Sequence, residues 1–361
     1  MKTNIIISTV LINIFLFFNC QMDKKNKGQS NISYNVELTH PYKELRVEFV
    51  SDTIFTVEGG KAHIPYGGTN NFWGQSNAIF TEQYGVPKQV KLIFYALHED
   101  IFYELDAILP VDRMKSLMDR AYAIRESESS DAEMKEFIKI SDNRNFEKEF
   151  NMYSHSYHKV SDFVLGFSPK GKVTMWLRFS RIQKFIGEYQ ATPIKDDEQV
   201  AKEFYSRMAV GREEVRKLYF IDKEIPDIWS DYLYSSKWGM KPIVADGRVR
   251  VLELNLKYFN MESETLLRPW LLNDKIRERG VPKVVTVTWE VSKDEKYYAN
   301  LFYDWEEVLS TFKEGKELGE NIFKISIEED NRTIKTYLGN LEVPYDSIRV
   351  FRSEEEYRDS Y

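Results

Sequence analysis

The sequence predicts an α+β protein made of two tandem, mainly antiparallel β-sheet domains, each with a packed helix. Residues 86–117 (VPKQVKLIFYALHEDIFYELDAILPVDRMKSL) align without gaps with residues 281–312 (VPKVVTVTWEVSKDEKYYANLFYDWEEVLSTF). Both segments first alternate apolar and polar residues at the spacing of a strand and then change to the spacing of a helix. An internal repeat of this kind predicts one fold unit used twice.

Each aligned segment begins with two strands joined by an acidic turn. Apolar side chains recur at every second position of the first strand: Val90, Leu92 and Phe94 in one copy, and Val285, Val287 and Trp289 in the other. Side chains at this period lie on one face of a sheet. Phe102-Tyr103 aligns with Tyr297-Tyr298 on the next strand. We therefore expect an antiparallel pair with one buried face in each copy.

The helix after each strand pair has recognisable ends. In the second copy Asp304 precedes Glu307 at the spacing of a capping box, and Gly315 follows the apolar stripe as a stop signal. In the first copy Pro110 marks the helix start. Each helix has one narrow apolar stripe, so we expect each to cover one face of its sheet.

Two further features complete each copy. A second hairpin follows the helix, with turns at residues 169–171 and near 330–331. Only the first copy carries a polar insertion, at about 119–160, which we expect to be extra helix plus loop. A helical stretch at about 197–217 is expected to join the copies.

The amino terminus is typical of an exported lipoprotein. Lys2 and the apolar stretch 5–18 form a secretion signal that is too short to span a membrane, which needs roughly 20 residues. Residues 17–20 (FFNC) resemble a bacterial lipobox, although Asn19 departs from the usual Gly, Ala or Ser. Cys20 is the only cysteine, so it can form no internal disulfide. A lipid explains it; the alternative is an incidental thiol in an ordinary signal or anchor.

These features predict the domain boundaries and the location. We expect a lipoprotein signal peptide at 1–19, a lipid-anchored tether at 20–34, the first domain at 35–215 and the second at 216–361. The tether carries a short basic run in place of the acidic run typical of surface-exposed lipoproteins. This favours an outer-membrane lipoprotein that faces the periplasm, with the membrane as a partner through the lipid. Fifty Lys and Arg against 57 Asp and Glu give no basic face for nucleic acid.

The combined pattern resembles a known family. A Trp-Gly segment, a Val-Pro-Lys strand start, an acidic turn, an aromatic pair, a helix and a closing hairpin follow a lipobox. Together they resemble the uncharacterised bacterial lipoprotein family catalogued as domain of unknown function 2931, in two tandem copies. The second copy departs from the first in having Trp305 where the first has Pro110. Since the family has no established activity, the resemblance implies no catalytic residues.

Few residues are candidates for catalysis or metal binding. The sequence has no Gly-rich phosphate loop, nucleophile elbow or His-Glu-x-x-His motif, so no catalytic residue and no cofactor is predicted. His155 and His158 are candidate metal ligands if they share a helix face, or else two exposed histidines of the insertion. Glu104 and Asp106 share a strand face, as an acid/base pair or as a solvent-facing acidic row.

The candidate binding residues are aromatic. A loop rich in Gly and Asn holds Phe72 and Trp73, and Trp238 precedes Gly239 at the start of the second copy. Aromatic side chains on a loop supported by a sheet commonly contact sugars, peptides or proteins. Alternatively, Trp73 and Trp238 turn inward and close the open end of each sheet.

Acidity, duplication and missing catalytic motifs favour a non-catalytic periplasmic binding protein with a protein partner. One example is an immunity protein that neutralises a toxin delivered into the envelope. An envelope structural or assembly factor and an unrecognised hydrolase are the alternatives.

Overall fold

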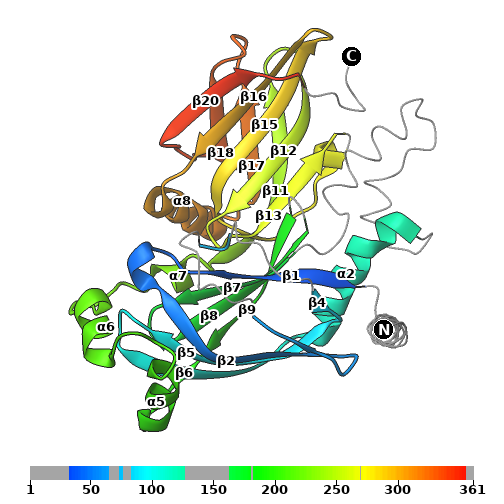
Figure 1. The fold of residues 1–361 in the computed structure, drawn as a ribbon. Helices are drawn as coiled ribbons and strands as arrows, with labels where there is room; N and C mark the ends of the chain where they lie inside the picture. The colour runs from blue at the N-terminus through cyan, green and yellow to red at the C-terminus, as the bar shows by residue number, and fades with distance from the viewer. Residues whose placement is uncertain are drawn as a thin grey trace, which may run out of the picture.

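The computed structural model describes residues 32–64, 73–75, 83–126, 162–179, 182–268 and 270–354. Figure 1 shows two β-rich halves, the N-terminal half in blue to green and the C-terminal half in yellow to red. The signal peptide, Cys20 and most of the tether and insertion lie outside the described residues.

In its described residues the first half contains ten short or medium strands: β1 (Ser33–Thr39), β2 (Val47–Thr56), β3 (Lys61–Ala62), β4 (Gln83–Tyr84), β5 (Pro87–Ala96), β6 (Ile101–Ile108), β7 (Asp162–Ser168), β8 (Lys172–Phe179), β9 (Ile182–Gln190) and β10 (Thr192–Pro193). Its helices are α2 (Val111–Glu126), α5 (Glu198–Tyr205), α6 (Arg212–Tyr219) and α7 (Ile228–Asp231), with a 3-10 turn at Lys43–Leu45.

The second half is also strand-rich: β11 (Ser235–Val244), β12 (Arg250–Tyr258), β13 (Ser263–Leu267), β14 (Arg277–Gly280), β15 (Pro282–Ser292), β16 (Glu295–Phe302), β17 (Ile322–Ile327), β18 (Ile334–Leu338), β19 (Leu341–Glu342) and β20 (Ser347–Arg352). It has one α-helix within the described residues, α8 (Trp305–Leu318), and a 3-10 turn at Trp270–Asn273.

The strand pairings of the two halves match one for one. The order β10-β6-β5-β2-β3 in the first half corresponds to β20-β16-β15-β12-β13 in the second, and β4-β1-β7-β8-β9 corresponds to β14-β11-β17-β18-β19. One pair in each half is parallel, β1 with β7 and β11 with β17. Where β9 meets β13, two of these five-stranded sets join into one ten-stranded sheet.

This layering differs from the single sheet per domain that the sequence pattern predicts. The second hairpin, β7–β8, pairs with β1 instead of with β5 and β6, and so forms a separate sheet. The two sheets pack face to face, as shown by Phe94 of β5 against Phe167 of β7, with ring centroids 5.1 Å apart. The protein is therefore a mostly β α+β fold with sandwiched sheets.

The predicted strand faces are confirmed. Val90, Leu92 and Phe94 are at most 2% exposed, and all three of their second-half counterparts are fully buried. The hairpin turns also lie where the sequence places them, at 169–171 between β7 and β8 and around 328–333 between β17 and β18. Period-two alternation thus identifies the core correctly in both halves.

The helix starts are confirmed, whereas one predicted end is wrong. Asp304 caps α8, and its Oδ1 accepts hydrogen bonds from the backbone N–H groups of Glu306 (2.8 Å) and Glu307 (3.2 Å). Pro110 immediately precedes α2. Gly315 does not end α8: it lies inside the helix against Leu338, and the chain leaves through left-handed Gly319. Close packing, not termination, explains the earlier glycine.

The segment between the halves is also less continuous than expected. The helix predicted at about 197–217 is two helices, α5 and α6, which are separated by a turn that ends at Gly211. Phe204 of α5 covers Tyr95 and Phe102 on the outer face of the first sheet. The boundary expected between residues 215 and 216 falls within α6.

Candidate functional site: the cleft where the halves meet

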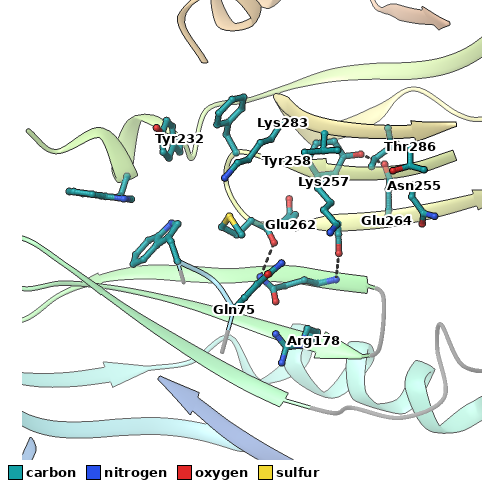
Figure 2. A pocket seen from close by; sticks show the side chains of 18 of the residues that line it. Gln75, Arg178, Tyr232, Asn255, Lys257, Tyr258, Glu262, Glu264, Lys283 and Thr286 are labelled. Carbon is teal, nitrogen blue, oxygen red and sulfur yellow. Dashed lines mark hydrogen bonds between the residues drawn. The ribbon is translucent and has the colours of Figure 1, made fainter. Parts of the chain in front are cut away.

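A cleft of about 680 Å³ lies where the ten-stranded sheet passes from one half to the other (Figure 2). Its lining combines aromatic, basic and acidic side chains from both halves. The lining residues are Pro41, Tyr42, Trp73, Gln75, Arg178, Gln183, Trp229, Tyr232, Asn255, Leu256, Lys257, Tyr258, Phe259, Met261, Glu262, Ser263, Glu264, Lys283, Val284 and Thr286. A volume of this size holds a ligand of ordinary small-molecule dimensions.

Gln183 of β9 joins the two halves at the cleft. Its side chain is 3% exposed, and its Nε2 donates to the carbonyl oxygens of Met261 (2.8 Å) and Gly74 (3.0 Å). Its backbone N–H donates to Oγ of Ser263 (3.0 Å), the residue with which Gln183 is in register where β9 pairs with β13. One buried amide therefore ties together the Trp73–Gln75 turn, the first half and the second half.

Residues 259–262 connect β12 to β13 and form a turn at the floor of the cleft, the floor turn. The carbonyl oxygen of Asn260 accepts a hydrogen bond from Nε1 of the fully buried Trp176 (2.9 Å). Oε1 of Glu262 accepts from the backbone N–H of Phe185 (3.0 Å). Met261 has a left-handed φ of +65°, which is uncommon for a side chain other than glycine. Contacts from the first half thus fix this turn.

Aromatic side chains line one side of the cleft. Trp73 packs edge-on against Trp176, with ring centroids 5.2 Å apart, and lies 6.3 Å from Trp229 of α7. Tyr232, just after α7, contacts Phe259 of the floor turn with centroids 5.3 Å apart. Aromatic walls supply large apolar contact areas for a ligand.

The acidic and cationic groups behind the floor turn are paired. Glu264 is 5% exposed and accepts hydrogen bonds from Nε of Arg279 (2.5 Å), from Arg277 (2.6 Å) and from the hydroxyl of Tyr258. Burial alone would raise the pKa of Glu264, but chiefly Arg279 lowers it to about 2. Arg279 also pairs with Asp274 (2.9 Å). This network holds β13 and β14 together beneath the cleft.

Two lysines on adjacent strands open into the cleft. Lys283 projects from β15 into the space between the walls (Figure 2), and Lys257 lies on β12. The Lys283 side chain is exposed to solvent, although the surrounding protein removes part of its hydration. This partial desolvation, together with the neighbouring charge of Lys257, lowers the pKa of Lys283.

The structure separates the two predicted tryptophans. Trp73 lines the cleft, whereas Trp238 is 1% exposed and packs between Phe312 and Phe323 in the second core. Trp238 lies on β11, the counterpart of β1, so the two Trp-Gly pairs are not equivalent in the fold. A buried core position offers no surface to a partner, so Trp238 is no part of this candidate site.

The other sequence candidates lie elsewhere. Phe72, His155 and His158 fall outside the described residues. Glu104 and Asp106 share a solvent-facing row on β6, and Asp106 pairs with Lys91 at 2.8 Å. Within the described part of the chain, no group of three His, Cys, Asp or Glu side chains is arranged to hold a metal ion.

Sequence reasoning missed most of the cleft. Lys283 stands in the Val-Pro-Lys repeat, but nothing local distinguishes it from Lys88 in the first copy. Gln183 and the floor turn lie far apart in the chain. The Arg-x-Arg alternation of β14 is the one signal for the buried network, and an exposed strand face produces the same pattern.

The fold and the cleft define a mostly β protein with an intramolecular cleft. The chain belongs to the family described as protein of unknown function (DUF2931), whose match covers residues 21–232. That range contains the described elements of the first half, from β1 to α7. No curated protein and no solved structure matches the chain. Among the helices described here, none has the length and apolar character needed to cross a membrane.

Proposed function

We propose that this protein is a non-catalytic binding protein of the cell envelope, lipidated at Cys20, facing the periplasm from the outer membrane, and using the cleft between its halves to hold a ligand. The cleft is the observation that carries the proposal. It places an aromatic wall next to two basic side chains in a space of about 680 Å³. The signal-like segment before Cys20 and the polar tether support the location.

We also infer that the halves descend from one duplicated unit, with domains near 35–215 and 216–361. The matching strand orders support this inference. Equivalent backbone hydrogen bonds recur as well: Leu109 N–H donates to the carbonyl oxygen of Lys88 (2.9 Å), and Tyr303 N–H donates to that of Lys283 (3.1 Å). Duplication produces a cleft between copies without any new fold.

The test is recovery of a ligand with the acylated protein. The protein is purified from its own detergent-solubilised envelope and examined by native mass spectrometry, which detects small molecules and protein partners alike. Val284→Trp fills the cleft, since the half-buried Val284 lines it. Gln89→Trp is the matched control, because Gln89 follows Lys88 in the first half as Val284 follows Lys283 in the second.

We expect a ligand with the wild type and with Gln89→Trp, and its loss from Val284→Trp. Absence of any ligand from the wild type would count against a binding role. A stoichiometric protein that survives Val284→Trp would favour the alternative of an envelope structural or assembly factor. Intact mass and membrane fractionation of Cys20→Ser test the anchor separately, since this variant is expected to leave the membrane fraction.

A further inference from the structure

A β-bulge brings the two cleft lysines together. In the pairing of β12 with β15, Lys257 lies opposite Val284, but the next residue of β12, Tyr258, lies opposite Pro282. Lys283 is therefore the extra residue of a bulge. A bulge redirects a side chain away from the regular alternation of the strand. Here it allows two lysines from adjacent strands to line the same cleft.

Neither lysine is neutralised by the described part of the protein. Lys257 and Lys283 form no ion pair with any described carboxylate. Of the other charged groups of the lining, Glu264 pairs with Arg279 and Arg178 pairs with Asp162 at 2.7 Å, while the Glu262 carboxylate accepts a hydrogen bond from a backbone N–H. Two like charges that line one cleft repel each other, as the lowered pKa of Lys283 beside Lys257 indicates, and an anion would relieve that repulsion.

Apolar and aromatic groups surround this pair of charges. The Lys283 ammonium lies 5.9 Å from the ring centroid of Phe259, within cation–π range. Phe259 packs against Tyr232, and Trp73 and Trp229 continue the wall. An anion without an apolar body would leave that wall exposed to water. A ligand with both an anionic group and an apolar body would contact the lysines and the aromatic wall together.

The first half supplies an internal comparison. Its equivalent bulge places Phe55 opposite Gln89 and Thr56 opposite Pro87, so Lys88 is the extra residue. The backbone geometry is thus repeated, but the neighbour equivalent to Lys257 is Phe55. Lys88 is exposed, as Lys257 and Lys283 are, but it does not line the cleft. The paired lysines are a property of the second half alone, not a requirement of the fold.

We propose that Lys257 and Lys283 bind an oxyanion carried by a ligand whose apolar or aromatic body lies against the wall formed by Trp73, Trp229 and Phe259. The inference rests on the proposed binding function and adds the chemical class of the ligand. The shared chemistry is a carboxylate, phosphate or sulfonate attached to an apolar body. Both lysines would donate charge-assisted hydrogen bonds to it.

The test compares two fluorescent probes of nearly the same shape. One is 8-anilinonaphthalene-1-sulfonate, an aromatic oxyanion, and the other is N-phenyl-1-naphthylamine, its neutral analogue. Each is titrated into the wild type and into Lys257→Met, Lys283→Met, Lys283→Arg and the first-half control Lys88→Met. Val284→Trp reports whether a probe binds in the cleft. Competition with decanoate or with inorganic phosphate, at equal ionic strength, separates an oxyanion on an apolar body from an oxyanion alone.

We expect each Met variant of the cleft pair to weaken sulfonate binding about tenfold, the range for loss of a charged hydrogen bond. Binding of the neutral probe should change little. Lys283→Arg and Lys88→Met should retain wild-type affinity for both probes, and decanoate should displace the sulfonate where phosphate does not.

Two results would overturn the inference. The first is a sulfonate affinity that is unchanged in both Met variants while Val284→Trp abolishes binding. That result would rule out the anion site but would still support ligand binding in the cleft. The second is displacement by phosphate alone, which removes the role of the apolar body. Failure of Val284→Trp to affect either probe, or no binding to the wild type, would instead count against the cleft as a binding site and hence against both proposals.

Discussion

His98 should make the protein less stable in acid. Its side chain is 2% exposed, and Nε2 lies 3.7 Å from Oε1 of Glu99. Burial lowers the pKa of His98 to about 4; His40 adds to the decrease and the backbone of Arg46 opposes it. The neutral imidazole is thus the form that the folded protein favours.

The size of the effect follows from the two pKa values. In the unfolded chain the pKa is near 6.5, so above that pH neither state binds the proton and stability is unaffected. Between about pH 6.5 and 4 the unfolded chain binds more protons, so the free energy of unfolding falls with pH, by about 3 kcal/mol in total. Below about pH 4 this contribution levels off.

The assay is urea unfolding followed by tryptophan fluorescence at pH 7.5 and 4.5. For wild type and for His98→Gln, the free energy of unfolding at pH 4.5 is subtracted from that at pH 7.5. This subtraction removes any pH-independent effect of the substitution on stability. His63→Gln is the control, because the His63 side chain is 62% exposed. We expect His98→Gln to lose about 2 to 3 kcal/mol of the wild-type pH difference. If it kept the whole difference, the assignment of acid sensitivity to His98 would be wrong.

Three further substitutions test the contacts between the two halves and the ion-pair network around Glu264. Gly74→Ala should lower the free energy of unfolding by about 2 kcal/mol in thermal denaturation, because φ is +67° and the new Cβ would lie 2.6 Å from the Cβ of Met261. Gly211→Ala is the control and should leave the free energy of unfolding unchanged, because its new Cβ meets open space. Gln183→Leu should remove two buried hydrogen bonds and lower the free energy of unfolding by about 2 to 4 kcal/mol. It should also speed amide hydrogen exchange in the floor turn. Unchanged exchange would refute the role of Gln183 in joining the two halves. Arg279→Met should lower stability by about 3 to 5 kcal/mol in urea, because a buried carboxylate loses its partner; a wild-type midpoint would contradict this.

Local signals predicted the elements, and non-local pairing decided their arrangement. The alternation of Val285 and Val287, the cap at Asp304 and the Pro110 helix start depend on neighbouring residues, so the sequence alone was sufficient for them. The pairing of β7 with β1 and of β9 with β13 depends on contacts between distant segments. No periodicity within a strand specifies its neighbour, so the second sheet layer was not predicted.

The same limit applies to the cleft. Trp73 was a candidate because an aromatic in a glycine-rich loop is a local feature. Trp238 had the same local feature, but β11 places it in the core at 1% exposure. Lys257 and Lys283 become neighbours only through a register shift between β12 and β15. In the sequence the shift shows only as a lysine in phase with buried Val285 and Val287; this does not reveal which residue lies opposite, and therefore the lysine pair was not found from sequence.

The repeated bulge gives this architecture an adaptable position. The carbonyl oxygens of Lys88 and Lys283 keep their bonds to the following strand whichever side chain is present, since the backbone alone makes them. The side chain at that position is therefore free to vary without loss of the surrounding ladder. At this position the backbone atoms maintain the fold and the side chain contributes to ligand preference. A single substitution there could therefore change ligand selectivity without disturbing the fold.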